Sequence, residues 1–95
     1  MERPYIGHVE ISGKMAEKLI TRRGLTRDDV RDACQAPSRY RRAAWHVHPE
    51  CGRRLIVFGS TSSGTLIKVI LQPVDQRDGT WRLRTAVVAT RREGA

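Results

Sequence analysis

Two histidines separated by a single residue, His46 and His48, are the side chains of this chain best suited to acid–base chemistry. An imidazole exchanges protons near neutral pH, and alternate residues of an extended strand point to the same face. Cations that suit phosphate oxygens fall at alternating positions of the segments that follow. They are Arg54, Lys68, Arg82 and Arg84. On one surface, these side chains would make a coherent site for RNA.

The segments that must position these residues are four predicted strands. After Pro37, apolar residues recur with a period of two, and clusters of turn residues separate the runs. Glycines flank one connector, at Gly59 and Gly64, and Asp78-Gly79 ends another. Such turn chemistry is typical of a meander of antiparallel strands. The predicted strands cover residues 40–48, 54–60, 66–72 and 80–89.

Two helices are predicted before these strands, over residues 14–23 and 26–36. Ser12 is a suitable N-cap for the first helix, and Gly24 suits its left-handed end. Thr26 and Asp29 have the spacing of a capping box, with Asp in place of the usual Glu. Residues 5–11 are predicted as a short strand or an extended lead-in.

Together these elements indicate a single domain over residues 1–95, of the α+β class. We expect two N-terminal helices packed on one face of a twisted, mainly antiparallel sheet of four to five strands, with the other face open. In the last strand, alternation puts Thr85 and Val87 with Leu83, and Ala86 with Arg84. The helix-covered face is expected to take Trp45, Val47, Leu55, Val57, Ile67, Val69, Leu71, Trp81 and Leu83.

The positive charge is concentrated in the predicted sheet. The net charge is +8, and residues 36–95 carry eleven Lys/Arg against four acids. A segregated basic charge favours a polyanion or an acidic protein as partner. No apolar run approaches the ~20 residues that span a bilayer, and the N-terminus does not resemble a secretory signal. We therefore expect a cytoplasmic protein with no membrane contact.

Two alternative sites are weighed and set aside. His46, His48 and Cys51 have the spacing of metal ligands, but no fourth ligand is evident, so we expect no metal and no cofactor. Two cysteines are too few for a disulfide framework. The loop from Gly59 to Gly64 lacks the Lys-Ser/Thr of a phosphate-binding loop and is predicted as a hairpin turn.

Several segments carry a resemblance to a known family. Residues 15–19, Arg23-Gly24-Leu25-Thr26 and Asp29-Val30 resemble its helical signature. Residues 52–55, 59–64 and 66–71 resemble its strand pair, and residues 85–93 resemble its closing segment. The chain is similar to the BrnT-type toxins of bacterial toxin–antitoxin modules, within the wider RelE/ParE-like superfamily. The resemblance covers about residues 12–93.

This resemblance implies a toxin-like, RelE-like domain that cuts mRNA without a metal and so inhibits translation. An acidic antitoxin would hold it in check, in a toxin–antitoxin hetero-oligomer. A ribose 2′-hydroxyl would attack the adjacent phosphate, which requires acid–base groups and cations. The catalytic residues implied are His46, His48 and Arg84; the RNA- or phosphate-binding residues are Arg54, Lys68, Arg82 and Arg91.

One departure from the family keeps a second hypothesis open. The arginine of the family's closing segment falls on Val87 here, which offers no charge. The alternative is a non-catalytic basic module that binds an acidic antitoxin, and nucleic acid with it, without cutting. The chain is an enzyme on the first hypothesis and not on the second.

Overall fold

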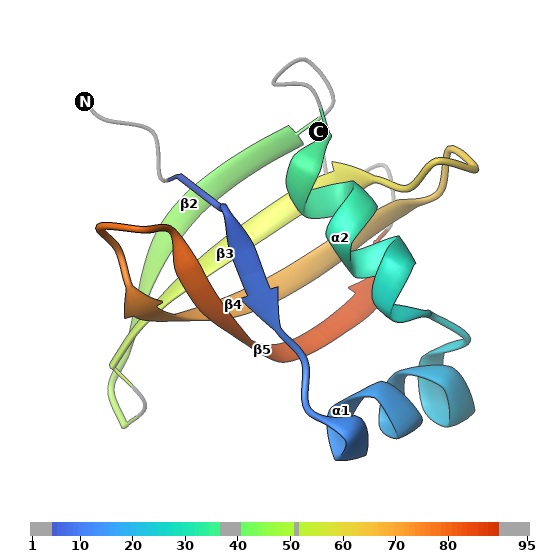
Figure 1. Cartoon of the computed structure of the whole chain (residues 1–95), viewed down its shortest axis with the longest axis horizontal. Helices are drawn as coiled ribbons and strands as arrows, with labels where there is room; N and C mark the ends of the chain where they lie inside the picture. The colour runs from blue at the N-terminus through green and yellow to red at the C-terminus, as the bar shows by residue number, and fades with distance from the viewer. Residues whose placement is uncertain (1–4, 37–40, 51, 90–95) are drawn as a thin grey trace.

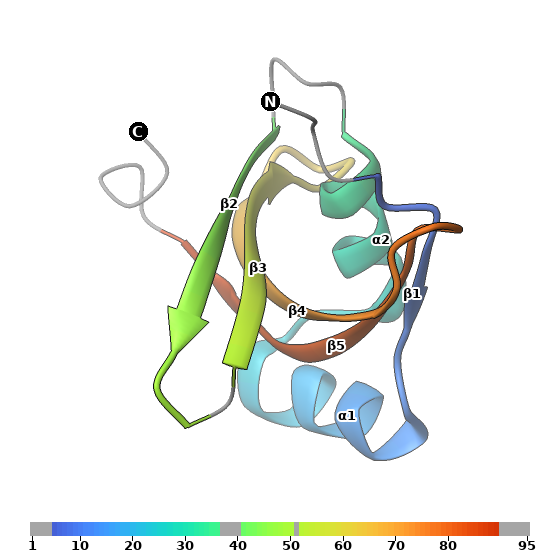
Figure 2. The same cartoon turned by 90° about the vertical axis from the view of Figure 1, so that its left-hand side faces the viewer.

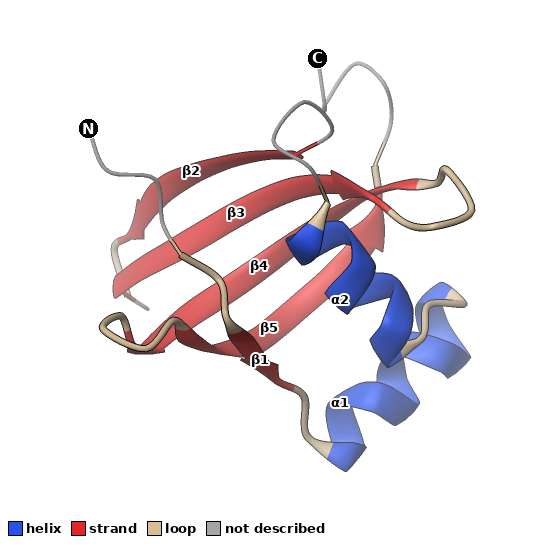
Figure 3. Cartoon of the chain, turned by 45° about the horizontal axis from the view of Figure 1, so that its top comes forward, coloured by secondary structure: helices blue, strands red, loops and turns tan. Residues whose placement is uncertain are grey.

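The computed structural model describes residues 5–36, 41–50 and 52–89. In chain order the elements are β1 (His8–Glu10), α1 (Gly13–Lys18), α2 (Arg27–Gln35), β2 (Arg41–His48), β3 (Gly52–Ser60), β4 (Leu66–Asp75) and β5 (Thr80–Val88). The five strands form one sheet in the order β1-β5-β4-β3-β2 (Figures 1 and 3). The predicted α+β class with two helices against a sheet is confirmed.

The sheet is mixed, which refines the predicted topology. The strands β2 to β5 form the expected antiparallel meander. β1 comes before both helices and pairs in parallel with β5, with Val9 opposite Trp81. The helices are therefore not the N-terminal elements. The connection from β1 to β5 runs through both helices and then β2, β3 and β4. A long connection of this kind is compatible with parallel pairing, because parallel strands cannot be joined by a tight turn.

The helix ends follow the predicted capping chemistry. The Ser12 hydroxyl accepts a hydrogen bond from the Met15 amide (3.1 Å). Thr26 and Asp29 form a reciprocal capping box at 3.0 and 3.1 Å. α1 continues as a wider π-helical turn, Leu19–Arg23, which ends at Gly24 with φ 67°. No helix in the described ranges is long and apolar enough to cross a membrane.

The sheet curves around α2, and the core fills the concave side. Figure 2 shows the curve from β2 through β3, β4 and β5 to β1, with α2 inside it. α2 packs on β3 and β4, while α1 and the turn after it pack on β5. The buried apolar residues are Ile6, Val9, Leu19, Leu25, Val30, Ala33, Cys34, Leu55, Val57, Ile67, Val69, Leu71, Trp81, Leu83 and Ala86.

The prediction for the first strand's apolar face was wrong. Trp45 is 36% exposed and Val47 is 69% exposed, because β2 lies beyond the strands that α2 covers. Trp81 is buried as predicted, and its Nε1 donates to the Tyr5 carbonyl (2.9 Å). The Trp45 and Trp81 ring centroids are 5.6 Å apart. Two strands separate them, so a flat sheet would place their backbones about 14 Å apart, and the curvature brings the rings together.

Cys34 gives a test of the packing of α2. Burial raises the pKa of its thiol to about 12, and the charge of Arg41 lowers it by less. The thiolate is the reactive species, so the folded protein should resist alkylation at pH 8. In the variant Cys51→Ser, which keeps Cys34 as its single thiol, we expect labelling on the order of 100-fold slower in buffer than in denaturant. Comparable rates would contradict the buried position.

Candidate nucleic-acid interface

A row of polar side chains crosses the sheet on the face away from the helices. The sheet register sets His46 opposite Arg54 and Gln72 opposite Arg82. Arg54 faces Gln72, since it precedes Leu55, which pairs with Leu71. Glu10 of β1 lies beside Arg82. We call this set the polar row: His46, Arg54, Gln72, Arg82 and Glu10.

Two further rows complete this uncovered surface, which we call the open face. The apolar row contains Ala44, Ile56, Ile70 and Thr85, which pair across the strands in that order. The mixed row beyond it contains Arg42, Phe58, Lys68 and Val87. The Lys68 ammonium lies 6.0 Å from the Phe58 ring centroid. The open face is therefore not uniformly cationic, because the apolar row separates Lys68 from the polar row.

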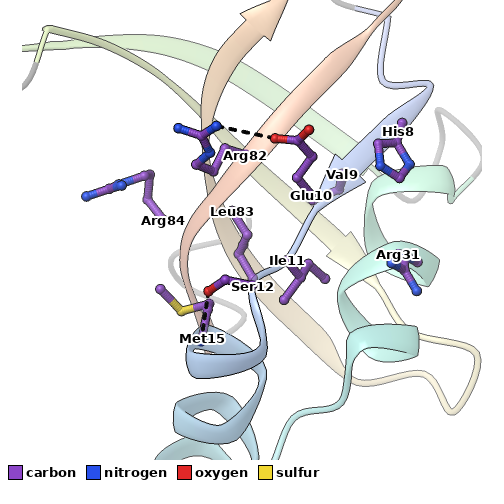
Figure 4. Close-up of a pocket in the computed structure, with 10 residues that line it drawn as sticks. All are labelled: His8, Val9, Glu10, Ile11, Ser12, Met15, Arg31, Arg82, Leu83 and Arg84. Atoms are coloured by element: carbon purple, nitrogen blue, oxygen red, sulfur yellow. Dashed lines mark hydrogen bonds and ion pairs between the residues drawn. The ribbon is translucent and has the colours of Figure 1, made fainter.

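A β-bulge in β5 adds a cation to the open face. Ile70 pairs with Thr85 and Leu71 with Leu83, so Arg84 is an extra residue without a partner on β4. Figure 4 shows Arg82 and Arg84 on the same side of β5, with Leu83 pointing the other way. The bulge shifts the alternation after it. Contrary to the predicted faces, Ala86 is buried in the core. Thr85 and Val87 therefore lie on the open face.

The two histidines lie at the β2 end of the open face, and both are exposed. Their Cα atoms are about 6.8 Å apart along the strand. The Glu50 amide donates to Nδ1 of His48 (3.1 Å). A neutral His48 with an acceptor at Nδ1 carries its hydrogen on Nε2. In this neutral form, His48 can donate a hydrogen bond from Nε2.

The predicted catalytic residues do not all lie in one place. His46 and His48 lie on β2, whereas Arg84 lies on β5, and β3 and β4 run between them. Three strand spacings amount to about 14 Å, too far for all three side chains to act on one phosphate. Arg54 is the cation that pairs with His46. Arg91 lies outside the residues that the structure describes.

The charged groups of the polar row are only loosely held. Arg82 forms an ion pair with Glu10 (Nη2–Oε1, 3.5 Å), and both side chains are well exposed. An exposed pair of this kind contributes about 0–1 kcal/mol, so a phosphate can displace the carboxylate. The Arg54 guanidinium donates to the Arg53 carbonyl (2.9 Å). Glu10 was missed by sequence reasoning, because only the pairing of β1 with β5 brings it to Arg82.

A hollow of about 500 Å³ borders the β5 end of the open face (Figure 4). It lies between β1, β5 and the start of α1, and its cations are Arg31, Arg82 and Arg84. In Figure 4 Arg31 lies beyond β1 from Arg82 and Arg84, so the three guanidinium groups do not converge on one anionic group. No three His, Cys, Asp or Glu side chains in the described ranges are close enough together to hold a metal ion.

Comparison with known proteins identifies no family for this chain. No protein-family model matches the chain, and no curated protein matches it. The resemblance to BrnT-type toxins therefore rests on the short motifs described above.

Proposed function

We propose that this protein binds single-stranded RNA along its open face and cleaves it without a metal at the β2 end. In this proposal it is the cytoplasmic toxin of a BrnT-type toxin–antitoxin module, inhibits translation by cutting mRNA, and is restrained by an acidic antitoxin. The observation that carries the proposal is the polar row, which spaces His46, Arg54 and Arg82 along one uncovered path across the sheet.

The binding step uses two kinds of group on the open face. Arg54 and Arg82 bind successive parts of the phosphate backbone through charge-assisted hydrogen bonds. The half-buried side chains of Ile56, Phe58 and Ile70 lie beside them and provide apolar contact for unstacked bases. A strand of RNA that crosses from β5 to β2 meets the arginines first and the histidines at its end.

The cleavage step uses the β2 end alone. His46 removes the proton of a ribose 2′-hydroxyl, and the 2′-oxygen attacks the adjacent phosphorus. Arg54 stabilises the negative charge of the phosphorane. The bond from phosphorus to the 5′-oxygen breaks, and this oxygen takes a proton from the imidazolium form of His48, in which Nδ1 no longer accepts from the Glu50 amide. The products are a 2′,3′-cyclic phosphate and a 5′-hydroxyl, with both protons accounted for.

The second candidate, a basic module that binds RNA and an antitoxin without cutting, is favoured by two observations. Val87 lies on the open face opposite Lys68, where the family's motif has an arginine. Arg82 and Arg84 are separated from the histidines by two strands. Both candidates share the binding step, so binding and cleavage need separate tests.

Salt dependence tests the binding step. Replacing Arg54 by glutamine should lower the slope of log K against log salt by about 0.7, the contribution of one phosphate contact on a single strand. Arg27→Gln is the matched control, because Arg27 is exposed on α2, away from the open face. Fluorescence anisotropy of labelled oligouridine measures both. An equal reduction of the salt slope in both variants would contradict a specific contact of Arg54 with phosphate, because it would show that only net charge matters.

A gain of affinity is expected from Val87→Arg. The new guanidinium would lie beside Lys68 on the open face and supply the cation that the family's motif has there. We expect RNA to bind about tenfold more tightly, which corresponds to one added charge-assisted hydrogen bond. Val88→Arg is the control, since Val88 is exposed on the opposite face of the same strand. An equal gain in Val88→Arg would contradict this assignment.

A further inference from the structure

The strand β2 is exposed on three sides. It is an edge strand, and β3 is its partner within the part of the chain that the structure describes. Its residues from Arg42 to His48 are all exposed. Figure 2 shows β2 on the outer side of the curved sheet, away from α2. From Arg41 to Val47, about 24 Å of strand, the edge away from β3 has no partner strand among the described residues and is a template for a further strand.

The two faces of β2 differ in chemistry. Ala43, Trp45 and Val47 lie on the concave side, while Arg42 and His46 lie on the open face. A strand added at this edge would alternate in the same way. Its residues on the concave side would contact Trp45 and Val47, and its residues on the other side would contact Arg42 and His46.

Charge identifies the kind of strand that fits. The segment from β2 to β3 carries four arginines against one acid, Glu50. A second copy of this chain would bring another net charge of +8 to the same edge, so like charges disfavour self-pairing. The Arg53 guanidinium covers one face of Trp45, 3.9 Å from the ring centroid, so an RNA base cannot stack on that face. An acidic protein segment is the occupant that these charges favour.

We infer that the free edge of β2 binds an extended segment of a partner protein in which acidic and apolar residues alternate. The segment adds a sixth strand to the sheet through backbone hydrogen bonds. Its apolar residues cover Trp45 and Val47, and its acidic residues face Arg42 and His46. This inference does not depend on RNA cleavage. If the proposed function holds as well, the added strand lies beside His46 and obstructs the β2 end of the polar row.

The experiment uses an eight-residue peptide in which valine and glutamate alternate, titrated into the isotopically labelled full chain. We expect amide shifts concentrated in β2 and a change in Trp45 fluorescence. Val47→Asp should weaken binding at least about tenfold, because it puts a charge against the apolar side of the peptide. Val88→Asp should leave the affinity unchanged, because Val88 is also exposed but lies on β5.

Two control peptides separate strand pairing from simple charge attraction. The same residues in block order should bind at least about tenfold more weakly, and so should an alternating peptide with every second amide methylated. Equal binding by either control would overturn the inference. So would no shift in β2 at about 1 mM peptide, or dimerisation of the chain that Val47→Asp abolishes. Because these measurements contain no RNA, their failure is distinct from failure of the proposed function.

Discussion

Replacing Gly59 by alanine should destabilise the protein by about 3 kcal/mol, at the upper end of the range for overpacked cores. Gly59 lies in β3, where α2 crosses it at close range. A Cβ atom at this position would lie 2.8 Å from the carbonyl carbon of Ala33 and closer still to its oxygen. These are backbone atoms of a helix, so the clash cannot be relieved by a side-chain rotation. The whole of α2 must move away from β3 and β4.

The expected readout is a fall of roughly 12–24 °C in the melting temperature, given the usual entropy of unfolding for a domain of this size. Gly13→Ala is the matched control, since a Cβ there has no neighbour within 4 Å and α1 begins at this residue. That variant should be as stable as the parent or slightly more so. A melting temperature of Gly59→Ala within about 3 °C of the parent would contradict the close packing of α2 on β3.

Replacing His46 by alanine should lower the rate of RNA cleavage by about 10²–10⁴-fold, the usual contribution of a general base. The loss should appear in kcat, with RNA affinity changed less than about threefold, because Arg54 and Arg82 supply the phosphate contacts. The measurement is single-turnover cleavage of a labelled oligonucleotide, alongside anisotropy for binding.

His8→Ala is the control for this variant, because His8 is also exposed but lies on β1, at the other edge of the sheet. Its cleavage rate should match that of the parent. Equal rates for His46→Ala and the parent would remove His46 from the mechanism. If Arg84→Ala alone abolished cleavage, the reaction would have to occur at the β5 end.

The helix caps and the antiparallel strands were the parts of the fold that the sequence predicted best. The caps at Ser12 and Thr26 depend on residues three positions away, so they are visible in the sequence. The antiparallel strands likewise follow from alternation and turn residues. The predicted strand over residues 54–60 ends at Ser60, where β3 ends. Gly59 is part of the strand, and its lack of a side chain serves the close approach of α2.

The long-range features were not predictable from local pattern. Strict alternation placed Ala86 on the open face, and the bulge at Arg84 reverses this, because one extra residue changes the face of every residue after it. Trp45 was expected in the core, yet sheet curvature leaves β2 outside the reach of α2. The pairing of Glu10 with Arg82 depends on β1 joining β5 in parallel, across most of the chain.

Alternation along each strand and the order of the strands in the sheet together explain which candidate site residues are neighbours. Alternation brought His46, Arg54, Lys68 and Arg82 to one face, because it holds along a strand as far as the first bulge. The order of the strands in the sheet then decides which of them are neighbours. That order separates His46 from Arg84, and no local signal contains it.

The central claim is that the open face holds RNA for cleavage without a metal. Its most direct test is incubation of the purified chain with single-stranded RNA in EDTA, followed by analysis of the product ends. We expect fragments with 2′,3′-cyclic phosphate and 5′-hydroxyl ends, formed at the same rate with or without EDTA. Intact RNA, or cleavage that requires a divalent cation and leaves 5′-phosphates, would contradict it.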